Sequence, residues 1–292
     1  MRAAFSDNIC YADKISELLN RYRSSGFAAP SLTSELATLD PEKIQAAIWE
    51  AMLYRHFEGL GASFLAPNVT KAGQNGPDLG INLDGIRLWV EAVVPTPTGL
   101  PDEWLAPIAK GEFKVWKLPH EEILLRYTSA LVSKKKQLDD RRAKGIVSAD
   151  DAYVIAVNGC LLSAWPGGES HGITQWPFIV EAVFPIGPLT IRVGADGKFL
   201  GDARNSHRPS IRNANKSDVP LDNFLNEDWA GISAVIWCGR KDHLAGLPLL
   251  AVHNPKAYVP IPSGALGIDR QHEYSAEDDG EGGYIIHQPG SG

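Results

Sequence analysis

Residues 76–95 decide the fold, and they read GPDLGINLDGIRLWVEAVVP. Asp84-Gly85 near the middle is a strong hairpin signal, because both central residues of a type I′ turn need positive φ. The turn sets the register of the two strands, so that Leu79 lies opposite Val90 and one face of the hairpin is wholly apolar. The sequence therefore predicts an antiparallel hairpin with one face toward a core.

The polar face of this hairpin carries two carboxylates directly opposite each other. The same register places Asp78 across from Glu91, with Cβ atoms about 5 Å apart. Like charges at that distance destabilise a sheet unless something neutralises them. A divalent metal ion is the natural candidate, since hard cations take carboxylate oxygens. The hairpin therefore predicts a metal site at Asp78 and Glu91.

Composition and charge are those of an ordinary globular protein. The 292 residues carry a formal net charge of -7, so any nucleic-acid contact must come from a local patch rather than a global basic field. The three cysteines lie far apart in the sequence, which fits neither a disulfide framework nor a zinc cluster and favours a reducing compartment. No signal peptide or bilayer-spanning apolar stretch is recognisable. We therefore expect a cytoplasmic protein.

A helix is expected on each side of the hairpin in the sequence. The first spans about residues 40–58, with Asp40 as its N-cap, and Glu50 lies within its wider apolar arc. The second spans about residues 120–144, and Lys134 is the one of three consecutive lysines that projects from its buried seam. The commoner alternatives are a rim position for Glu50 and a lysine that reaches solvent.

The chain after the second helix is rich in strand signals. Residues 152–158 form a near-continuous apolar run, and the path from the hairpin through the helix to this run is a βαβ crossover. Further strands are expected at about 177–184, in a hairpin over 189–200 that turns near Asp196-Gly197, at 232–237 and at 249–253. We therefore expect an α/β fold, with a mixed central sheet flanked by helices. The expected single domain spans residues 1–268, and an acidic, mobile tail spans 269–292.

Two weaker patterns lie outside this scheme. The tetrapeptide Val-Glu-Ala-Val occurs at 90–93 and again at 180–183, where no hairpin with an aspartate precedes it. The loop over 202–216 is basic, and its cationic residues are Arg204, Arg208, Arg212 and Lys216. A solvated loop is the favoured interpretation, and a phosphate-contact surface is the functional alternative.

A short strand is also expected at 62–66, so the expected elements follow the order helix, three strands, helix and strand. With Pro77-Asp78 at the start of one strand and Glu91 on the next, this αβββαβ pattern resembles the PD-(D/E)XK nuclease superfamily, which has the restriction-endonuclease-like fold. The resemblance covers about residues 40–160. Residues 161–268 would then be a β-rich extension of the core sheet.

The resemblance implies a nuclease that hydrolyses phosphodiester bonds of nucleic acid, with DNA favoured. Its cofactor would be Mg²⁺, with Mn²⁺ as a substitute, since Mg²⁺ prefers oxygen ligands. By this resemblance, Asp78, Glu91 and the carbonyl of Ala92 would hold the metal. Glu50 would add a ligand or orient a metal-bound water.

The lysine of the superfamily pattern is displaced in this chain. Such nucleases carry a lysine two residues beyond the second carboxylate, where this chain has Val93. In some branches the following helix supplies the lysine, and Lys134 fits that role. Arg126 and Gln137 flank Lys134 on the helix and could hold phosphate or orient water.

Two functions of different classes follow from these observations. The first is a Mg²⁺-dependent nuclease, favoured by the carboxylate pair and Lys134. The second is a catalytically inactive nuclease-fold protein that binds nucleic acid or another protein, favoured by Val93 and the acidic net charge. Nucleic acid is the expected partner, a homodimer stays open, and no membrane contact is expected.

Overall fold

The computed structural model describes residues 2–70, 76–109, 111–164, 170–201, 203–239, 249–278, 280 and 284–288. Its α-helices are α1 (Arg2–Ser24), α2 (Leu32–Ala37), α3 (Pro41–Gly59), α4 (Asp102–Leu105), α5 (His120–Ala143) and α6 (Phe178–Glu181). The strands of its central sheet are β1 (Ser63–Phe64), β2 (Leu79–Leu83), β3 (Ile86–Val93), β4 (Ala152–Asn158), β9 (Ala234–Cys238), β10 (Leu250–His253), β11 (Glu273–Asp278) and β12 (Tyr284–His287). Two small antiparallel pairs are β5 (Ile186–Thr190) with β6 (Arg204–His207), and β7 (Ser210–Arg212) with β8 (Asp218–Pro220).

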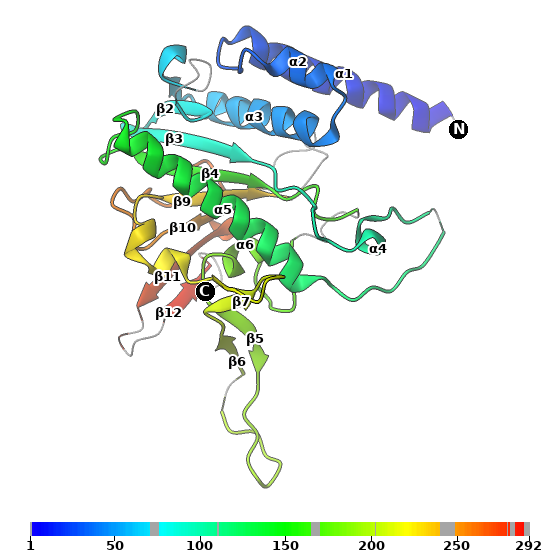
Figure 1. Ribbon diagram of the computed structural model, residues 1–292, viewed down its shortest axis with the longest axis vertical. Coiled ribbons are helices and arrows are strands. Elements are labelled where there is room, and N and C mark those ends of the chain that lie inside the picture. The colour runs from blue at the N-terminus through cyan, green and yellow to red at the C-terminus, as the bar shows by residue number, and fades with distance from the viewer. Residues whose placement is uncertain are drawn as a thin grey trace.

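The central sheet is mixed and has eight strands in the order β1-β2-β3-β4-β9-β10-β11-β12. Helix α3 packs on one face and helix α5 on the other, and each helix covers its own apolar core. Helices α1 and α2 pack against α3 at one end of the molecule (Figure 1). The α/β fold with a mixed sheet flanked by helices is therefore confirmed.

The hairpin of β2 and β3 has the expected register. Leu79 pairs with Val90, and the turn residues Asp84 and Gly85 have φ values of 49° and 83°. Positive φ at both positions is what a type I′ turn requires. The apolar face of the hairpin belongs to the core under α3, whereas Trp89 belongs to the core under α5.

Helix α3 begins where the sequence indicates. The Asp40 carboxylate accepts a hydrogen bond from the backbone N–H of Glu42 at 2.9 Å, which satisfies one of the unpaired donors of the first turn. Inside the fold, the Trp49 indole N–H donates to the carbonyl of Ala156 at 2.9 Å. This bond ties the middle of α3 to the centre of the sheet.

The crossover from β3 through α5 to β4 is also present. Strand β4 pairs in parallel with β3 on one side and with β9 on the other. The buried seam of α5 includes Leu124, Leu131 and Leu138. As expected, β9 and β10 of the second half extend the same sheet.

Residues 177–184 differ from the expectation of a strand. They contain the short helix α6, and the N–H of Ala182 bonds back to the carbonyl of Phe178 at 2.9 Å. A short apolar run that is buried all round shows no period-two alternation, so a strand and a helical turn look alike in sequence. The expected hairpin over 189–200 is present, with Val193 opposite Phe199.

Part of the segment expected to be a mobile tail belongs to the sheet instead. Strand β11 pairs in parallel with β10, and β12 pairs antiparallel with β11. Tyr274 and Ala276 are buried on β11. Their period-two spacing within an acidic stretch builds a half-buried strand, so composition was the poorer guide here.

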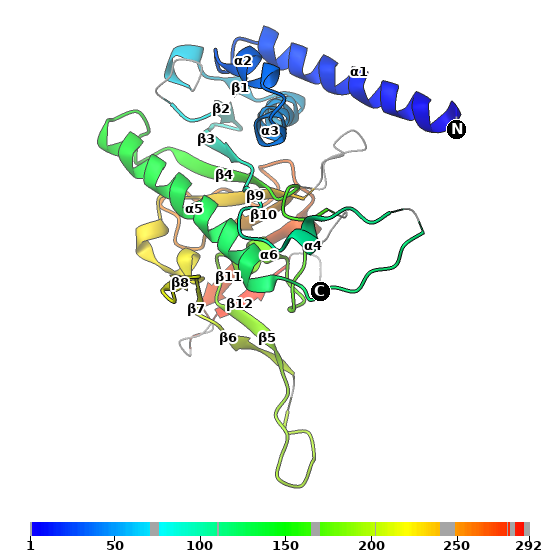
Figure 2. The same cartoon turned by 45° about the vertical axis from the view of Figure 1, so that its right-hand side comes forward.

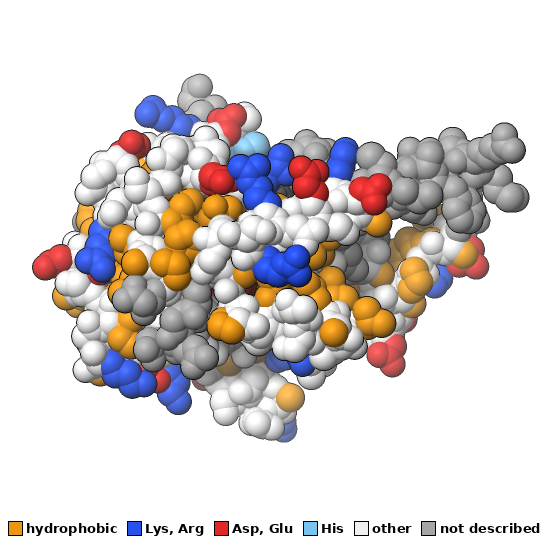
Figure 3. Space-filling view, turned by 90° about the horizontal axis from the view of Figure 1, so that it is seen from above, with side chains coloured by type: hydrophobic (Ala, Val, Ile, Leu, Met, Phe, Trp, Pro, Cys, Tyr) orange, Lys and Arg blue, Asp and Glu red, His pale blue; other side chains and the backbone are white. Residues whose placement is uncertain are grey.

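The surface carries charges of both signs. The hairpin of β5 and β6 extends away from the body of the molecule (Figure 2). On the α1–α3 end, Lys and Arg side chains lie among Asp and Glu side chains rather than forming one basic field (Figure 3). Among the described residues, no helix is long and apolar enough to cross a membrane.

Candidate functional site

Glu91 is the centre of a buried polar cluster beneath α5. The residue is only 2% exposed. Lys134 on α5 places Nζ 2.8 Å from Oε1 of Glu91, and Arg141, two turns later, donates from Nη1 to Oε2. The hydroxyl of Tyr153 on β4 lies 3.4 Å from the same Oε2. Both oxygens of Glu91 therefore have a cationic partner.

Asp78 lies next to Glu91 at the start of β2. Its Oδ2 accepts a hydrogen bond from the backbone N–H of Ala92 at 2.7 Å, and the residue is 3% exposed. Strand N–H groups point along the plane of the sheet, so their acceptor lies near that plane. The Asp78 carboxylate therefore closes the end of the β2–β3 ladder and sits between the two faces of the sheet.

The charges in this cluster are coupled. Burial and then the neighbouring Asp78 raise the pKa of Glu91, whereas Lys134 and Arg141 partly offset that rise. Burial and the negative charge of Glu91 raise the pKa of Tyr153 well above its ordinary value, so this phenol stays protonated. Asp78 and Glu91 together are thus a strained pair of like charges that the two cations neutralise.

Glu50 points inward on the other face of the sheet. It is 8% exposed, and the Tyr22 hydroxyl donates to its Oε2 at 3.3 Å. Burial, Glu50 and Asp78, in that order, raise the pKa of Tyr22 well above its ordinary value. A rim position for Glu50 is therefore wrong. Asp78 is close enough to act electrostatically on both Tyr22 and Glu91.

The three consecutive lysines have different environments. Lys134 does face the sheet, and its Nζ also lies 3.4 Å from Oε1 of Gln137. Lys135 pairs with Asp139 at 2.7 Å on the outer side of α5, and Lys136 is exposed. Gln137 thus belongs with Lys134, one turn along the helix.

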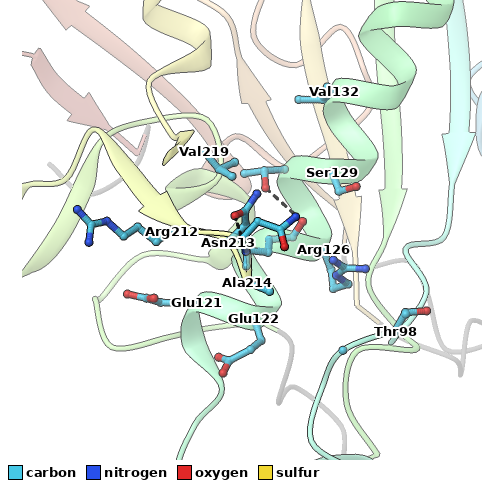
Figure 4. A pocket seen from close by; sticks show the side chains of 14 residues that line it. Thr98, Glu121, Glu122, Arg126, Ser129, Val132, Arg212, Asn213, Ala214 and Val219 are labelled. Atoms are coloured by element: carbon cyan, nitrogen blue, oxygen red, sulfur yellow. Dashed lines mark hydrogen bonds between the residues drawn. The ribbon is translucent and has the colours of Figure 1, made fainter. Parts of the chain in front are cut away.

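Arg126 lies away from the carboxylate pair. It lines a pocket of about 630 Å³ between the N-terminal half of α5 and the β7–β8 hairpin (Figure 4). Arg212, the last residue of β7, lines the same pocket, together with Glu121 and Glu122. The pocket therefore brings together two arginines that the sequence suggested separately. Its lining is of mixed charge.

Arg141 and Tyr153 were not among the candidates from the sequence. Simple rules of helix and strand geometry could have predicted both. Arg141 follows Lys134 by seven residues, which is two helical turns, so the two side chains share a face. Tyr153 lies on the strand that pairs with β3, and it pairs with Trp89, two positions before Glu91.

Another buried glutamate lies near the first turn of α5. Glu181 accepts from Nε2 of His120 at 2.8 Å and from the hydroxyl of Thr174. Arg208 directs Nη1 to Nδ1 of His120 at 3.2 Å and pairs with Glu121 at 2.6 Å. Because arginine only donates, Nδ1 accepts and Nε2 carries the proton given to Glu181. Arg208 is therefore built into the fold rather than a solvated member of the basic loop.

Within the described parts of the chain, no three or more His, Cys, Asp and Glu side chains are grouped to hold a metal ion. No family model matches the chain, and its comparison with curated proteins and with solved structures gives no significant match. What this protein does is therefore inferred from the geometry of its own residues.

Proposed function

We propose that the protein is a metal-dependent nuclease that hydrolyses phosphodiester bonds, with DNA as its substrate. The single observation that carries this proposal is the contact of 2.8 Å between Nζ of Lys134 and Oε1 of Glu91, beside Asp78. Two carboxylates and an amino group at the end of an antiparallel hairpin are the groups that metal-assisted phosphodiester hydrolysis uses.

The donor atoms suit Mg²⁺ or Mn²⁺ better than zinc. Mg²⁺ is often held by one or two carboxylates, with waters and substrate phosphates completing its shell. Asp78 and Glu91 would be those carboxylates, and the carbonyl of Ala92 is the third donor that we propose. When bound, such an ion polarises a phosphate oxygen and lowers the pKa of bound water.

The chain's own residues have separate tasks in this proposal. Lys134 would stabilise the nucleophile or the charge that develops on the phosphate. Gln137 would hold the amino group in place through its side-chain carbonyl. Glu50, with Tyr22, would support the site from the opposite face of the sheet. Arg126 would contact phosphate farther along α5.

The order of elements supports membership of the PD-(D/E)XK nuclease superfamily as part of the proposal. Helix α3, the strands β1, β2 and β3, helix α5 and β4 occur in the order that the superfamily uses, with the four-residue helix α4 inserted between β3 and α5. Val93 stands at the usual lysine position and packs against the core under α5. Lys134 would replace that lysine from the helix.

A second candidate function is an inactive nuclease-fold protein that binds nucleic acid or another protein. One observation favours it: each oxygen of Glu91 contacts a cationic side chain, Lys134 or Arg141. A protein that kept the cluster only for stability would need no further ligand. Metal binding therefore separates the two candidates.

The direct experiment is a cleavage assay on labelled DNA with Mg²⁺ and with chelator. We expect wild-type cleavage only with metal, and a loss of about 100-fold or more in Asp78→Asn and Lys134→Met, similar to removal of a group that stabilises the transition state. Lys135→Met is the matched control and should retain the wild-type rate. Metal-dependent cleavage that is unchanged in Asp78→Asn would contradict the proposal.

A further inference from the structure

Arg141 occupies one of the two oxygens that Glu91 could offer to a metal ion. Its Nη1 contacts Oε2, while Lys134 holds Oε1. The guanidinium also donates to the Tyr153 hydroxyl at 3.2 Å. Both cationic side chains are largely covered, with 16% of Lys134 and 18% of Arg141 exposed. In this arrangement a metal ligand is already fully paired.

The charge balance of the cluster leaves little room for a divalent ion. The carboxylates of Asp78 and Glu91 contribute two negative charges, and Lys134 with Arg141 contribute two positive charges. A divalent ion added to these four groups would leave an excess of positive charge that the Glu50 carboxylate on the other face could offset only in part, and burial makes such an excess costly. One of the two side-chain cations therefore has to move when a metal binds.

The geometry selects Arg141 as the cation that moves. Lys134 has a second acceptor in Gln137, on its own helix one turn away. Arg141 lies in the last turn of α5, which ends at Ala143, and its other partner is a neutral phenol. A guanidinium also matches the geometry of a phosphate, because it donates two parallel hydrogen bonds.

We propose that Arg141 is an internal counter-ion that competes with the divalent metal for Glu91, and that a substrate phosphate draws it away. This inference rests on the proposed nuclease function and adds a regulation to the same site. Without nucleic acid, Arg141 keeps the metal affinity low. With nucleic acid, the guanidinium moves to a phosphate and Glu91 becomes available, so metal and substrate bind cooperatively.

The test is a calorimetric titration of Mn²⁺ into wild type, Arg141→Gln and Arg142→Gln. Arg142 is the matched control, because it is the next residue and donates to the carbonyl of Gly231 at 3.1 Å instead. We expect Arg141→Gln to bind Mn²⁺ about 10-fold more tightly than wild type, the usual size of a coupling between two sites. Arg142→Gln should bind it like wild type.

A second titration tests the role of phosphate. A phosphorothioate oligonucleotide, which is charged, should tighten Mn²⁺ binding by wild type but hardly at all by Arg141→Gln. A methylphosphonate oligonucleotide, whose backbone is neutral, should tighten neither. If Arg141→Gln fails to fold by circular dichroism, Arg141→Met carries the same expectations.

The outcomes separate this inference from the nuclease proposal. If wild type binds Mn²⁺ and the Arg141 variants bind it equally or more weakly, Arg141 is no competitor, while the nuclease proposal stands. If neither wild type nor any variant binds Mn²⁺, both ideas are wrong.

Discussion

The same four residues, Val-Glu-Ala-Val, build two different buried glutamates in this molecule. At 90–93 they lie in strand β3, and at 180–183 they run through the end of helix α6 and the turn after it. Both Glu91 and Glu181 are buried and both are reached from α5. The tetrapeptide therefore decides neither the local structure nor the role of its carboxylate.

The two carboxylates differ in the groups that surround them. Glu91 has a second carboxylate, Asp78, beside it, and two full cations from α5 neutralise the pair. Glu181 instead accepts hydrogen bonds from an imidazole and a hydroxyl, which satisfy a single carboxylate. We infer that the first is a chemical site and the second a structural anchor.

The two glutamates should differ most in their effect on the rate of cleavage. We expect Glu91→Gln to reduce metal-dependent cleavage by about 100-fold or more, because it removes a charged ligand from the centre. Glu181→Gln should keep a rate within a few-fold of wild type per folded molecule. The rates are compared by single-turnover cleavage, after the folded fraction has been measured. Equal losses in both variants would remove the distinction.

Stability should distinguish the two glutamates in the opposite sense, with the larger loss at Glu181. His120→Ala leaves Glu181 buried without its main partner, and we expect it to lower the free energy of unfolding by about 3 kcal/mol or more, the cost of a buried charged acceptor that has lost its donor. Urea unfolding with chelator present measures this change. A loss below about 1 kcal/mol would show that Thr174 alone satisfies Glu181.

Lys134→Met should lower the free energy of unfolding less than His120→Ala does, although it should abolish cleavage. Glu91 retains Arg141 and the Tyr153 hydroxyl after this change. We expect a loss of about 1.5–3 kcal/mol, the size of one hydrogen bond to a charged group. The same urea experiment measures it, with Lys135→Met as control. A loss as large as that of His120→Ala would show that Lys134 is itself a structural anchor.

The buried glutamate Glu273 should give the smallest effect, which should be seen only in acid. Burial by itself would raise its pKa, but His253, the Ser263 hydroxyl and the N–H of Gly264 outweigh burial and lower it. A lowered pKa stabilises the fold above the ordinary glutamate value of 4.5, and this contribution is lost as pH falls through the folded value. Glu273→Gln should therefore lose less stability than wild type between pH 4.5 and strong acid, measured as melting temperature against pH.

The carboxylate pair and its helix could be predicted because local rules specify them. The turn at Asp84-Gly85 sets the β2–β3 register by its φ requirements, and helical periodicity turns Lys134 toward the sheet. The same helical periodicity could also have predicted that Arg141 faces the sheet.

The rest depends on contacts that no local pattern contains. Helix α6 looks like a strand because its side chains are buried on every side. The Glu181 anchor joins residues from four separate segments, and only the folded chain brings His120 to it. Strand β11 was hidden because its acidic composition masks a period-two pattern.

The measurement that tests the central claim most directly is the stoichiometry of Mn²⁺ bound by wild type, Glu91→Gln and Glu181→Gln, each with a phosphorothioate oligonucleotide present. We predict one ion per chain in wild type and in Glu181→Gln, and loss of that ion in Glu91→Gln. Undiminished binding in Glu91→Gln, or no binding in wild type, would contradict a metal centre at Asp78 and Glu91.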